Sequence, residues 1–491
     1  TNETAGDRRI YLEAMVDYNR TFGRHDVNAM LLYNQDELVN NVPGNNLINS
    51  LPKRKQGLAG RLSYAYDGKY MAEVNMGYNG SENFAKGHRW GFFPSIALGY
   101  NISEESFFEP LRKVITSMKL RGSWGLVGND QIGGERFIYM PTINLSGKGF
   151  TTGIDQNYGL SGPVYTRYEN NSITWEVGEK INLGIDLQLL NSLNIVVDIF
   201  RETRRDIFQK KGTIPTYLGT GNTDVFGNLA EMKNQGLDLS IDYNKAFSKD
   251  FYMNFKGTFT YAHNEITKYD EAPKYAFQSK VGQSANVSQG YLSNGLFLDE
   301  AEIDRYNQQM GSTLGAGDIK YLNVSNMHGY GDDIVDVDDW TWIGNPTVPE
   351  IVYGFGPSFK YKNWDFSFFF QGVAKTSLFM SGFHPFGDNS LRNVLQFVAN
   401  DRWSPTNQNV DAKYPRLTRK TSLNNTNPGN SGRTSDYWMR DGSFLKLKNM
   451  ELGYTFKRMR FYISGSNLLT FSKFDLWDPE QGGGSGLKYP T

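Results

Sequence analysis

The sequence predicts an all-β fold, a large antiparallel barrel whose strands cross a membrane, and three observations support this. Stretches of about ten residues alternate between apolar and polar side chains along most of the chain. Gly accounts for 52 of 491 residues and aromatic side chains for 14%, which is typical of strands joined by tight turns. Short and long connections between the predicted strands alternate, as they do in outer-membrane barrels.

The clearest element is a hairpin at the start of the segment 57–109. Two strand-like runs flank the dipeptide Asp67-Gly68, and this dipeptide favours a type I′ turn because both residues tolerate positive φ. Along the second run, apolar and polar side chains alternate. We expect one set to face lipid (Tyr70, Val74, Tyr78) and the other to face the lumen (Glu73, Asn75).

The same alternation predicts roughly fourteen strands of barrel length. The other expected strands are 8–22, 24–37, 90–100, 115–127, 181–189, 193–199, 237–243, 251–262, 351–359, 364–370, 443–456 and 460–471. A short strand is expected near Phe137–Ile143, and a short helix at Glu300–Asn307. Polar side chains on the strands are expected to line the lumen, among them Asp186, Gln188, Asp238 and Asp242.

The lengths of the connections alternate with the strand order. Short turns are expected at Gly23, Asp67-Gly68, Asn191-Ser192, Lys249-Asp250, Lys362-Asn363 and Lys457-Arg458, with an intermediate connector at Ser103–Lys113. Long loops are expected near 128–171, 264–349 and 381–441. We therefore assign the short turns to the periplasmic side and the long loops to the extracellular side. A soluble β-sandwich remains an alternative, because a half-buried sheet alternates in the same way.

Aromatic side chains lie near the ends of several predicted strands. In a membrane barrel they would form girdles at the two interfaces, and in any other sheet they would be ordinary strand residues. The candidates are Tyr66, Tyr70, Tyr78, Trp90, Tyr100, Trp175, Trp364 and Phe456.

Composition and motifs argue against several functional classes. The net charge of −1 gives no electrostatic footprint for nucleic acid, and no apolar run approaches the ~18–20 residues of a membrane helix. The chain has no cysteine, and its five histidines are scattered. No HExxH motif, P-loop or GxSxG elbow is present. The sequence therefore does not predict an enzyme.

Motifs spread over the whole chain resemble those of the SusC/RagA-type TonB-dependent outer-membrane transporters of Bacteroidetes. The matching runs are Asp17–Gly23 with His25–Asn28, Gly60-Arg61 through Tyr70-Met71, Arg89–Ser95, Lys119–Gly125 with Gly128-Asn129-Asp130, Phe444–Asn449, Asn467–Leu469 and Asp478-Pro479-Glu480. Their occurrence in the family's order makes the resemblance specific, although each run alone is short.

The resemblance implies a barrel of about 22 strands with an internal plug. We accordingly expect residues 1–491 to be the C-terminal part of one such barrel, without the plug, the TonB box, about seven early strands and the last strand. The implied function is TonB-energised import of oligomeric nutrients, glycan or peptide. The implied partners are a SusD-like surface lipoprotein as a lid, TonB-ExbB-ExbD acting through the N-terminal region, membrane lipid, and a second transporter–lipoprotein pair in a dimer. A passive porin or a surface-adhesion barrel is the alternative.

The densest acidic cluster precedes Thr341-Trp342-Ile343-Gly344-Asn345-Pro346. The family often carries a calcium-loop-like motif at this place, and three carboxylates fall on ligand-like positions: Asp332, Asp336 and Asp339. His328 and Tyr330 occupy two positions where oxygen ligands are expected, and calcium prefers six to eight oxygens. The alternatives are a bound Ca²⁺ and an acidic turn that braces the loop.

Three aromatic residues lie next to this cluster in the sequence: Tyr330, Trp340 and Trp342. Their rings are candidates for substrate binding, because aromatic rings stack on sugar faces and pack on peptide side chains. The alternative is that they attach a long loop to the barrel wall.

Overall fold

The computed structural model describes residues 6–40, 51–133, 136–215, 217, 224–306, 308–309, 314–330, 333–380, 394–417 and 434–482. The chain divides into two compact units. The first unit comprises Thr1–Ile241 with Asn264–Ala272, and the second comprises Asp242–His263 with Pro273–Thr491.

One antiparallel sheet of 14 strands runs through the chain, which confirms the predicted number and the all-β fold. Its order is β1-β2-β3-β4-β5-β6-β9-β10-β11-β12-β19-β20-β23-β24, so each long strand pairs with the next one along the chain. The bounds are β1 Asp7–Phe22, β2 His25–Asn40, β3 Lys53–Tyr66, β4 Tyr70–Ser81, β5 Trp90–Asn101, β6 Ile115–Asn129, β9 Glu176–Leu189, β10 Leu193–Lys210, β11 Phe226–Ala246, β12 Phe251–Lys268, β19 Ile351–Tyr361, β20 Trp364–Ala374, β23 Phe444–Phe456 and β24 Met459–Ser472.

The short connections have the geometry that the sequence predicts. Asp67 and Gly68 have φ of 55° and 66°, and Lys69 N donates to Tyr66 O at 2.9 Å, which closes the type I′ turn. Between β9 and β10 the residues with positive φ are Leu190 and Asn191, one position before the predicted pair. The connector after β5 consists of two 3₁₀ turns, η1 (Ile102–Glu104) and η2 (Ser106–Leu111).

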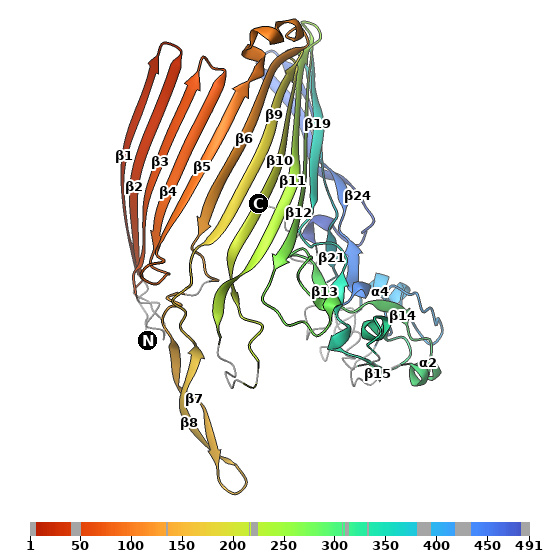
Figure 1. Ribbon diagram of the computed structural model, residues 1–491. Coiled ribbons are helices and arrows are strands. Elements are labelled where there is room, and N and C mark those ends of the chain that lie inside the picture. Colours follow the sequence, from red (N-terminus) through yellow and green to blue (C-terminus); the bar gives the residue numbers. More distant parts are fainter. Residues whose placement is uncertain are drawn as a thin grey trace. The chain divides into compact units, whose positions relative to one another are not determined.

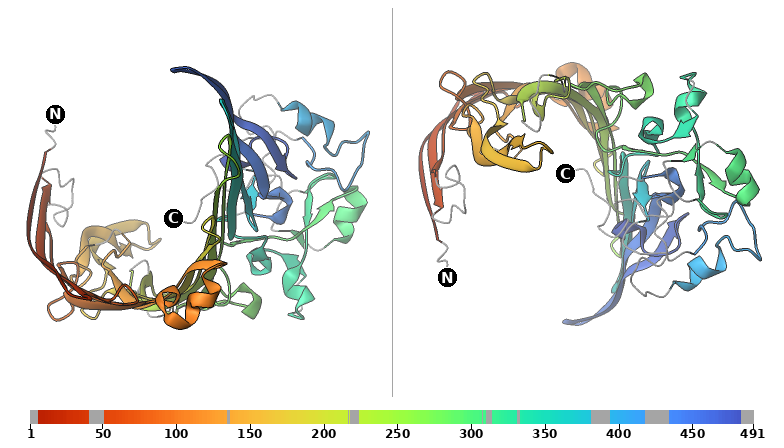
Figure 2. Two further views of the ribbon diagram at one scale, coloured as in Figure 1. Left: turned by 90° about the horizontal axis from the view of Figure 1, so that it is seen from above. Right: turned by 90° about the horizontal axis from the view of Figure 1, so that it is seen from below.

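Within the first unit, the short turns lie at one end of the strands and the long connections at the other (Figure 1). Figure 2 shows β1–β10 of this unit as a curved wall. The segment after β6 contains a two-stranded hairpin of β7 (Thr142–Thr152) and β8 (Tyr158–Arg167), which projects beyond the wall (Figure 1). The strand expected near Phe137–Ile143 begins later in the structure, at Thr142, as β7. Phe137 adopts φ of 49° in a turn, and Ile138 is fully buried in a small core instead of joining a ladder.

In the second unit, the described parts of the two long segments fold into short elements. Four small pairings occur: β13 (Ser288–Gly290) with β18 (Thr341–Ile343), β14 (Ser293–Leu296) with β16 (Ile319–Tyr321), β15 (Gln308–Gln309) with β17 (Ile334–Val335), and β21 (Ser377–Phe379) with β22 (Met439–Asp441). The short helical elements are η4 (Ala276–Gln278), α2 (Glu300–Arg305), α3 (Val324–Met327), η5 (Val337–Asp339), α4 (Gln396–Asn400), η6 (Asp436–Trp438) and η7 (Pro479–Gln481). The predicted helix is therefore confirmed, with Asp299 as its N-cap.

We call these folded segments, 273–350, 375–443 and 473–482 where described, the loop domain. They share one hydrophobic core, to which the segment before β19, the segment after β20 and the segment after β24 all contribute: Tyr291, Leu296, Ile319, Tyr321, Val335, Leu378, Met380, Val398, Trp403, Ala412, Tyr414, Trp438 and Phe474. The sequence predicted long loops here, and the structure shows packing between them. Residues 381–393 and 418–433 of the third predicted loop lie outside the described residues.

The wall strands carry large apolar side chains that are exposed, including Leu62, Val74, Leu98, Leu183 and Ile199. Buried hydrophobic residues gather in the loop domain and in a small core of the first unit around Phe84 and Trp175. Among the described residues, no helix has the length and hydropathy needed to span a membrane. An exposed apolar wall face is the surface that a lipid bilayer would cover.

Candidate functional site

A polar row crosses the wall of the first unit. Strand register places seven side chains side by side on six neighbouring pairings: Asn19, Asn28, Ser63, Glu73, Ala97, Ser123 and Asn182. Glu73 accepts hydrogen bonds from Ser63 Oγ and Asn75 Nδ2, both at 2.9 Å. The prediction that Glu73 and Asn75 share the polar face is therefore confirmed. Such a face lines the interior of an outer-membrane barrel.

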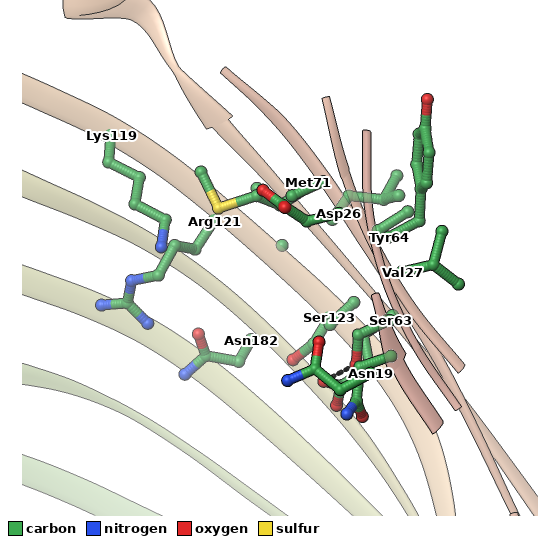
Figure 3. Close-up of a pocket in the computed structure, with 18 residues that line it drawn as sticks. Asn19, Asp26, Val27, Ser63, Tyr64, Met71, Lys119, Arg121, Ser123 and Asn182 are labelled. Carbon is green, nitrogen blue, oxygen red and sulfur yellow. Dashed lines mark hydrogen bonds between the residues drawn. The ribbon is translucent and has the colours of Figure 1, made fainter. Parts of the chain in front are cut away.

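Small side chains on this face leave a hollow of about 480 Å³. Ala65, Ala97 and Gly99 contribute little volume, while Lys119 and Arg121 stand at its edge. Figure 3 shows Lys119, Arg121 and Asn182 on one side of the strands, with Val27 and Tyr64 pointing to the opposite side.

Arg121 on β6 bridges two carboxylates from the next two strands. Its Nη2 lies 2.8 Å from Asp186 Oδ1 on β9 and 3.0 Å from Asp198 Oδ2 on β10. The guanidinium passes over Gly184, where a Cβ atom would lie 2.6 Å from Asp198 Oδ1 and 2.8 Å from Arg121 Cζ. A side chain at position 184 would therefore have to displace the ends of Arg121 and Asp198 from their present positions. Two donors bound to one carboxylate give the strongest kind of protein ion pair.

The sequence identified part of this cluster. Asp186 was expected to face the lumen, and Arg121 lies in the run Lys119–Gly125 that carries the family resemblance. Asp198 was missed because it lies in an apolar run, although its spacing from Ile195, Val197 and Ile199 puts it on the opposite face.

The second unit has a polar row of the same kind. Register aligns Asn254, Ser358, Ser367, Glu451 and Ser464 across five strands. They line a second hollow of about 470 Å³ together with Lys256. Arg460 donates to Asp365 and Glu451 on the neighbouring strands. Both units therefore present a polar, charged face and an apolar face.

The motif residues Phe444–Asn449 and Asp478-Pro479-Glu480 meet in one ion cluster. Lys446 Nζ is fully buried and lies 2.6 Å from both carboxylate oxygens of Asp478 and 2.7 Å from Glu480 Oε2. Lys448 Nζ lies 2.7 Å from Glu480 Oε1. We call these four residues the clasp, because they attach the segment after β24 to β23.

The clasp shifts the titration of both its carboxyl groups. Burial raises the pKa of Asp478 and of Glu480, but the hydrogen bonds they accept and the charges of Lys446 and Lys448 together lower each pKa by more. The net pKa of both groups lies below the ordinary value, so both are held as carboxylates.

Two other family-like motifs pack together in the first unit. The ring of Phe93 lies against Gly128, where a Cβ atom would be 1.9 Å from Phe93 Cζ. Asp130 of the Gly128-Asn129-Asp130 run accepts from Ser81 Oγ and Lys55 Nζ, both at 2.7 Å. These contacts explain why a glycine and an aspartate occupy those two positions, and their role is to stabilise the fold.

In the described part of the predicted acidic cluster, the carboxylates cap the short 3₁₀ helix η5. Asp336 and Asp339 form a capping box around η5, and Asp339 accepts from the backbone N–H of Ser325 at 2.9 Å and of Asp336 at 2.8 Å. Burial raises the pKa of Asp339 despite these donors. Asp332 lies outside the described residues. Among the described residues, no group of three or more potential metal ligands converges. Calcium binding stays a prediction.

The three candidate aromatic residues differ in their surroundings. Trp342 Nε1 donates to Ser279 O at 2.8 Å, and the ring of Trp340 meets that of Tyr291 edge-on at 5.8 Å beside the loop-domain core. Both contacts hold the loop domain together. Tyr330 is 49% exposed, with its ring centroid 4.2 Å from that of Tyr275. Tyr330 is therefore the candidate with surface left for a ligand, and its role stays a prediction.

The expected aromatic girdles are present in part. Tyr70 stacks on Tyr100 at 5.1 Å near the short turns, and Tyr78 stacks on Trp90 at 4.8 Å toward the other end of the same strands. Trp175 was placed wrongly in a girdle. It is buried in the small core beside Phe84 and Phe93, and its Nε1 donates to Arg89 O at 3.2 Å.

A comparison with protein-family models identifies the family of this chain. The model described as "TonB dependent receptor-like, beta-barrel" matches residues 1–468. The chain belongs to this family. The outer-membrane location and the barrel architecture predicted from the sequence are thereby confirmed.

Individual relatives agree with the SusC/RagA resemblance. "TonB-dependent receptor SusC" of Bacteroides thetaiotaomicron is 28% identical over 447 residues, which cover 86% of this chain and 41% of the relative. "TonB-dependent receptor P3" of Formosa agariphila is 26% identical over 445 residues, with 86% and 41% covered. The solved structure of the RagAB peptide transporter matches with a TM-score of 0.69 and 20% identity, over 97% of this chain and 53% of that chain. The chain thus spans about half the length of these relatives.

Proposed function

We propose that this chain forms most of the wall of an outer-membrane importer for oligomeric nutrients, glycan or peptide, energised through TonB. The observation that carries the proposal is the family match over residues 1–468, together with the similarity to SusC and to the RagAB peptide transporter. The named relatives are receptors and transporters, and the proposal assigns no enzymatic activity to this chain.

The two faces of the wall support this function. Polar rows and charged clusters such as Arg121 with Asp186 and Asp198 give the interior a hydrated, charged surface. A plug or a polar solute can exchange hydrogen bonds with such a surface at little net cost. The exposed apolar side chains of the other face suit the hydrocarbon of the membrane.

The β7–β8 hairpin supports the proposal that a SusD-like lipoprotein closes the importer as a lid. Leu145, Phe150 and Ile154 on this hairpin are 77%, 73% and 103% exposed. A two-stranded hairpin is marginal by itself in water, and exposed apolar side chains of this size mark contact surfaces. We assign this surface to the lid. The proposal also includes a dimer of transporter–lipoprotein pairs and no nucleic-acid partner.

Uptake by cells that express the full-length transporter tests the function. Labelled maltooligosaccharides and mixed oligopeptides are supplied with and without an intact TonB system. Uptake of one class that stops when TonB is deleted is the expected result, and it also identifies the substrate class. Uptake that continues without TonB would identify a passive porin.

The lid is tested separately by co-purification. The double variant Phe150→Ser, Ile154→Ser is expected to lose most of the co-purified SusD-like lipoprotein. Met327→Ser is the matched control, because Met327 lies in the loop domain and is 68% exposed, and this variant should retain the lipoprotein. Equal retention by both variants would refute the assignment of the hairpin.

A further inference from the structure

An unbroken row of aromatic side chains crosses the apolar face of the second unit next to the short turns. Register pairs Phe251 with Tyr361, Tyr361 with Trp364, Trp364 with Tyr454 and Tyr454 with Phe461, so the row spans five strands. Two of these pairs bring their rings together, with centroids 4.7 Å apart for Trp364 and Tyr454 and 6.4 Å apart for Phe251 and Tyr361. We call these five residues the aromatic row.

Exposed cations lie next to the aromatic row, four of them in the three turns of this unit and one, Lys245, near the end of β11. They are Lys245, Lys249, Lys362, Lys457 and Arg458. Among the described residues, none of the five forms an ion pair, and Asp250 is the single carboxylate in these turns. Lys362 Nζ lies 5.6 Å from the ring of Tyr361, and Lys457 Nζ lies 5.5 Å from the ring of Phe456. We call the five cations the basic rim.

The basic rim differs from several other lysines of the second unit, which form ion pairs. Elsewhere in its described part, exposed lysines such as Lys413 and Lys473 lie near a carboxylate, at 3.8 and 3.7 Å from Asp401 and Asp441. The turns are also tied to one another, because Lys362 N donates to Asp250 O and Thr455 N to Asn363 O, both at 2.8 Å. The cations therefore sit on a connected, fixed edge.

We propose that the basic rim binds the phosphate groups of anionic phospholipids in the membrane leaflet on the short-turn side. Tyr and Trp rings settle at the level of lipid headgroups, so the aromatic row sets the depth of this edge in the membrane. Cations just beyond the rings then lie at the level of the phosphates, where each contributes attraction to an anionic surface. The charge of the rim is complementary to phosphate, and the flanking rings cover the first segment of the acyl chains.

Native mass spectrometry of the full-length transporter tests the proposal. The protein is exchanged into detergent with equal amounts of palmitoyl-oleoyl phosphatidylglycerol and the phosphatidylcholine of the same chains. Wild type is expected to retain phosphatidylglycerol preferentially. Each lysine lost should weaken retention about five-fold, so Lys362→Asn, Lys457→Asn should lower it roughly 25-fold. Asn adopts the φ values of 53° and 52° found at these two positions, so the turns are preserved.

The matched control is Lys413→Gln, Lys473→Gln, which removes the same charge from the loop domain. It should leave the lipid preference unchanged. A preference that survives in the rim variant, or that falls equally in the control, would overturn the proposal. Inorganic phosphate at millimolar concentration should fail to displace the lipid. Displacement would show a general anion site and would also overturn the proposal. A failure here leaves TonB-dependent uptake unaffected, so the two proposals are tested separately.

Discussion

Lys446→Met is the sharpest test of how the closing motif works. The change removes the charge and keeps an unbranched apolar side chain in a position that is fully buried. Asp478 and Glu480 then lose a donor that lies 2.6 to 2.7 Å from three of their oxygens. Removing one partner of a buried ion pair costs ~3–5 kcal/mol. Because the two carboxylates are 35% and 20% exposed, water can replace part of the interaction, and we expect about 3 kcal/mol.

The effect should be local, because the clasp connects the segment 473–482 to one strand. A loss of about 3 kcal/mol raises the open population of this segment roughly a hundred-fold. Hydrogen exchange of the full-length transporter in detergent, followed by mass spectrometry, measures this as faster exchange at Trp477–Gly482. Phe474 and Trp477 should also become accessible to protease, since they pack against the loop-domain core.

Lys473→Met is the matched control. Lys473 Nζ lies 3.7 Å from Asp441 Oδ2 and its side chain is 87% exposed, so its removal should change exchange by less than about 1 kcal/mol. Glu480→Gln gives a second variant that keeps Lys446 and should also loosen the segment. Unchanged exchange in both Lys446→Met and Glu480→Gln would refute the role of the clasp.

Three further predictions follow from the same geometry. Protection of the clasp segment from hydrogen exchange should be complete above about pH 4.5. It should decrease as the pH falls below the ordinary pKa values of Asp478 (3.8) and Glu480 (4.5), because the pKa of both groups is lowered in the folded state. Protection that does not change between pH 6 and pH 3 would contradict this. Gly184→Ala should lower the free energy of unfolding in urea by about 1–3 kcal/mol, since the new Cβ displaces Arg121 from Asp198. Gly159→Ala is the control and should leave the free energy of unfolding unchanged, because the space around Gly159 is open. Gly68→Val should cost about 1–2 kcal/mol in the same assay because of the left-handed φ of 66°, and an unchanged midpoint would count against the type I′ turn.

The wall could be predicted closely because its signals are local. Alternation of period two and an Asp-Gly turn are properties of adjacent residues, so they identify strands and hairpins without knowledge of distant contacts. The start of the strand expected near Phe137–Ile143 was misplaced for the same reason, because residues 137–141 do not join β7. Its apolar residues satisfy a short-range pattern, but burial of Ile138 in the core around Trp175 determines their conformation.

The sequence by itself determined the strand order, the sorting of short and long connections, and the family. The tertiary structure decided which distant residues meet. Arg121 and Asp198 are 77 positions apart and Lys446 and Asp478 are 32 apart, and their contacts depend on strand register and on the path of the chain after β24. The loop-domain core likewise joins segments separated by whole strands. Charge pairing and core packing are set by proximity in space, which a periodic pattern along the chain does not encode.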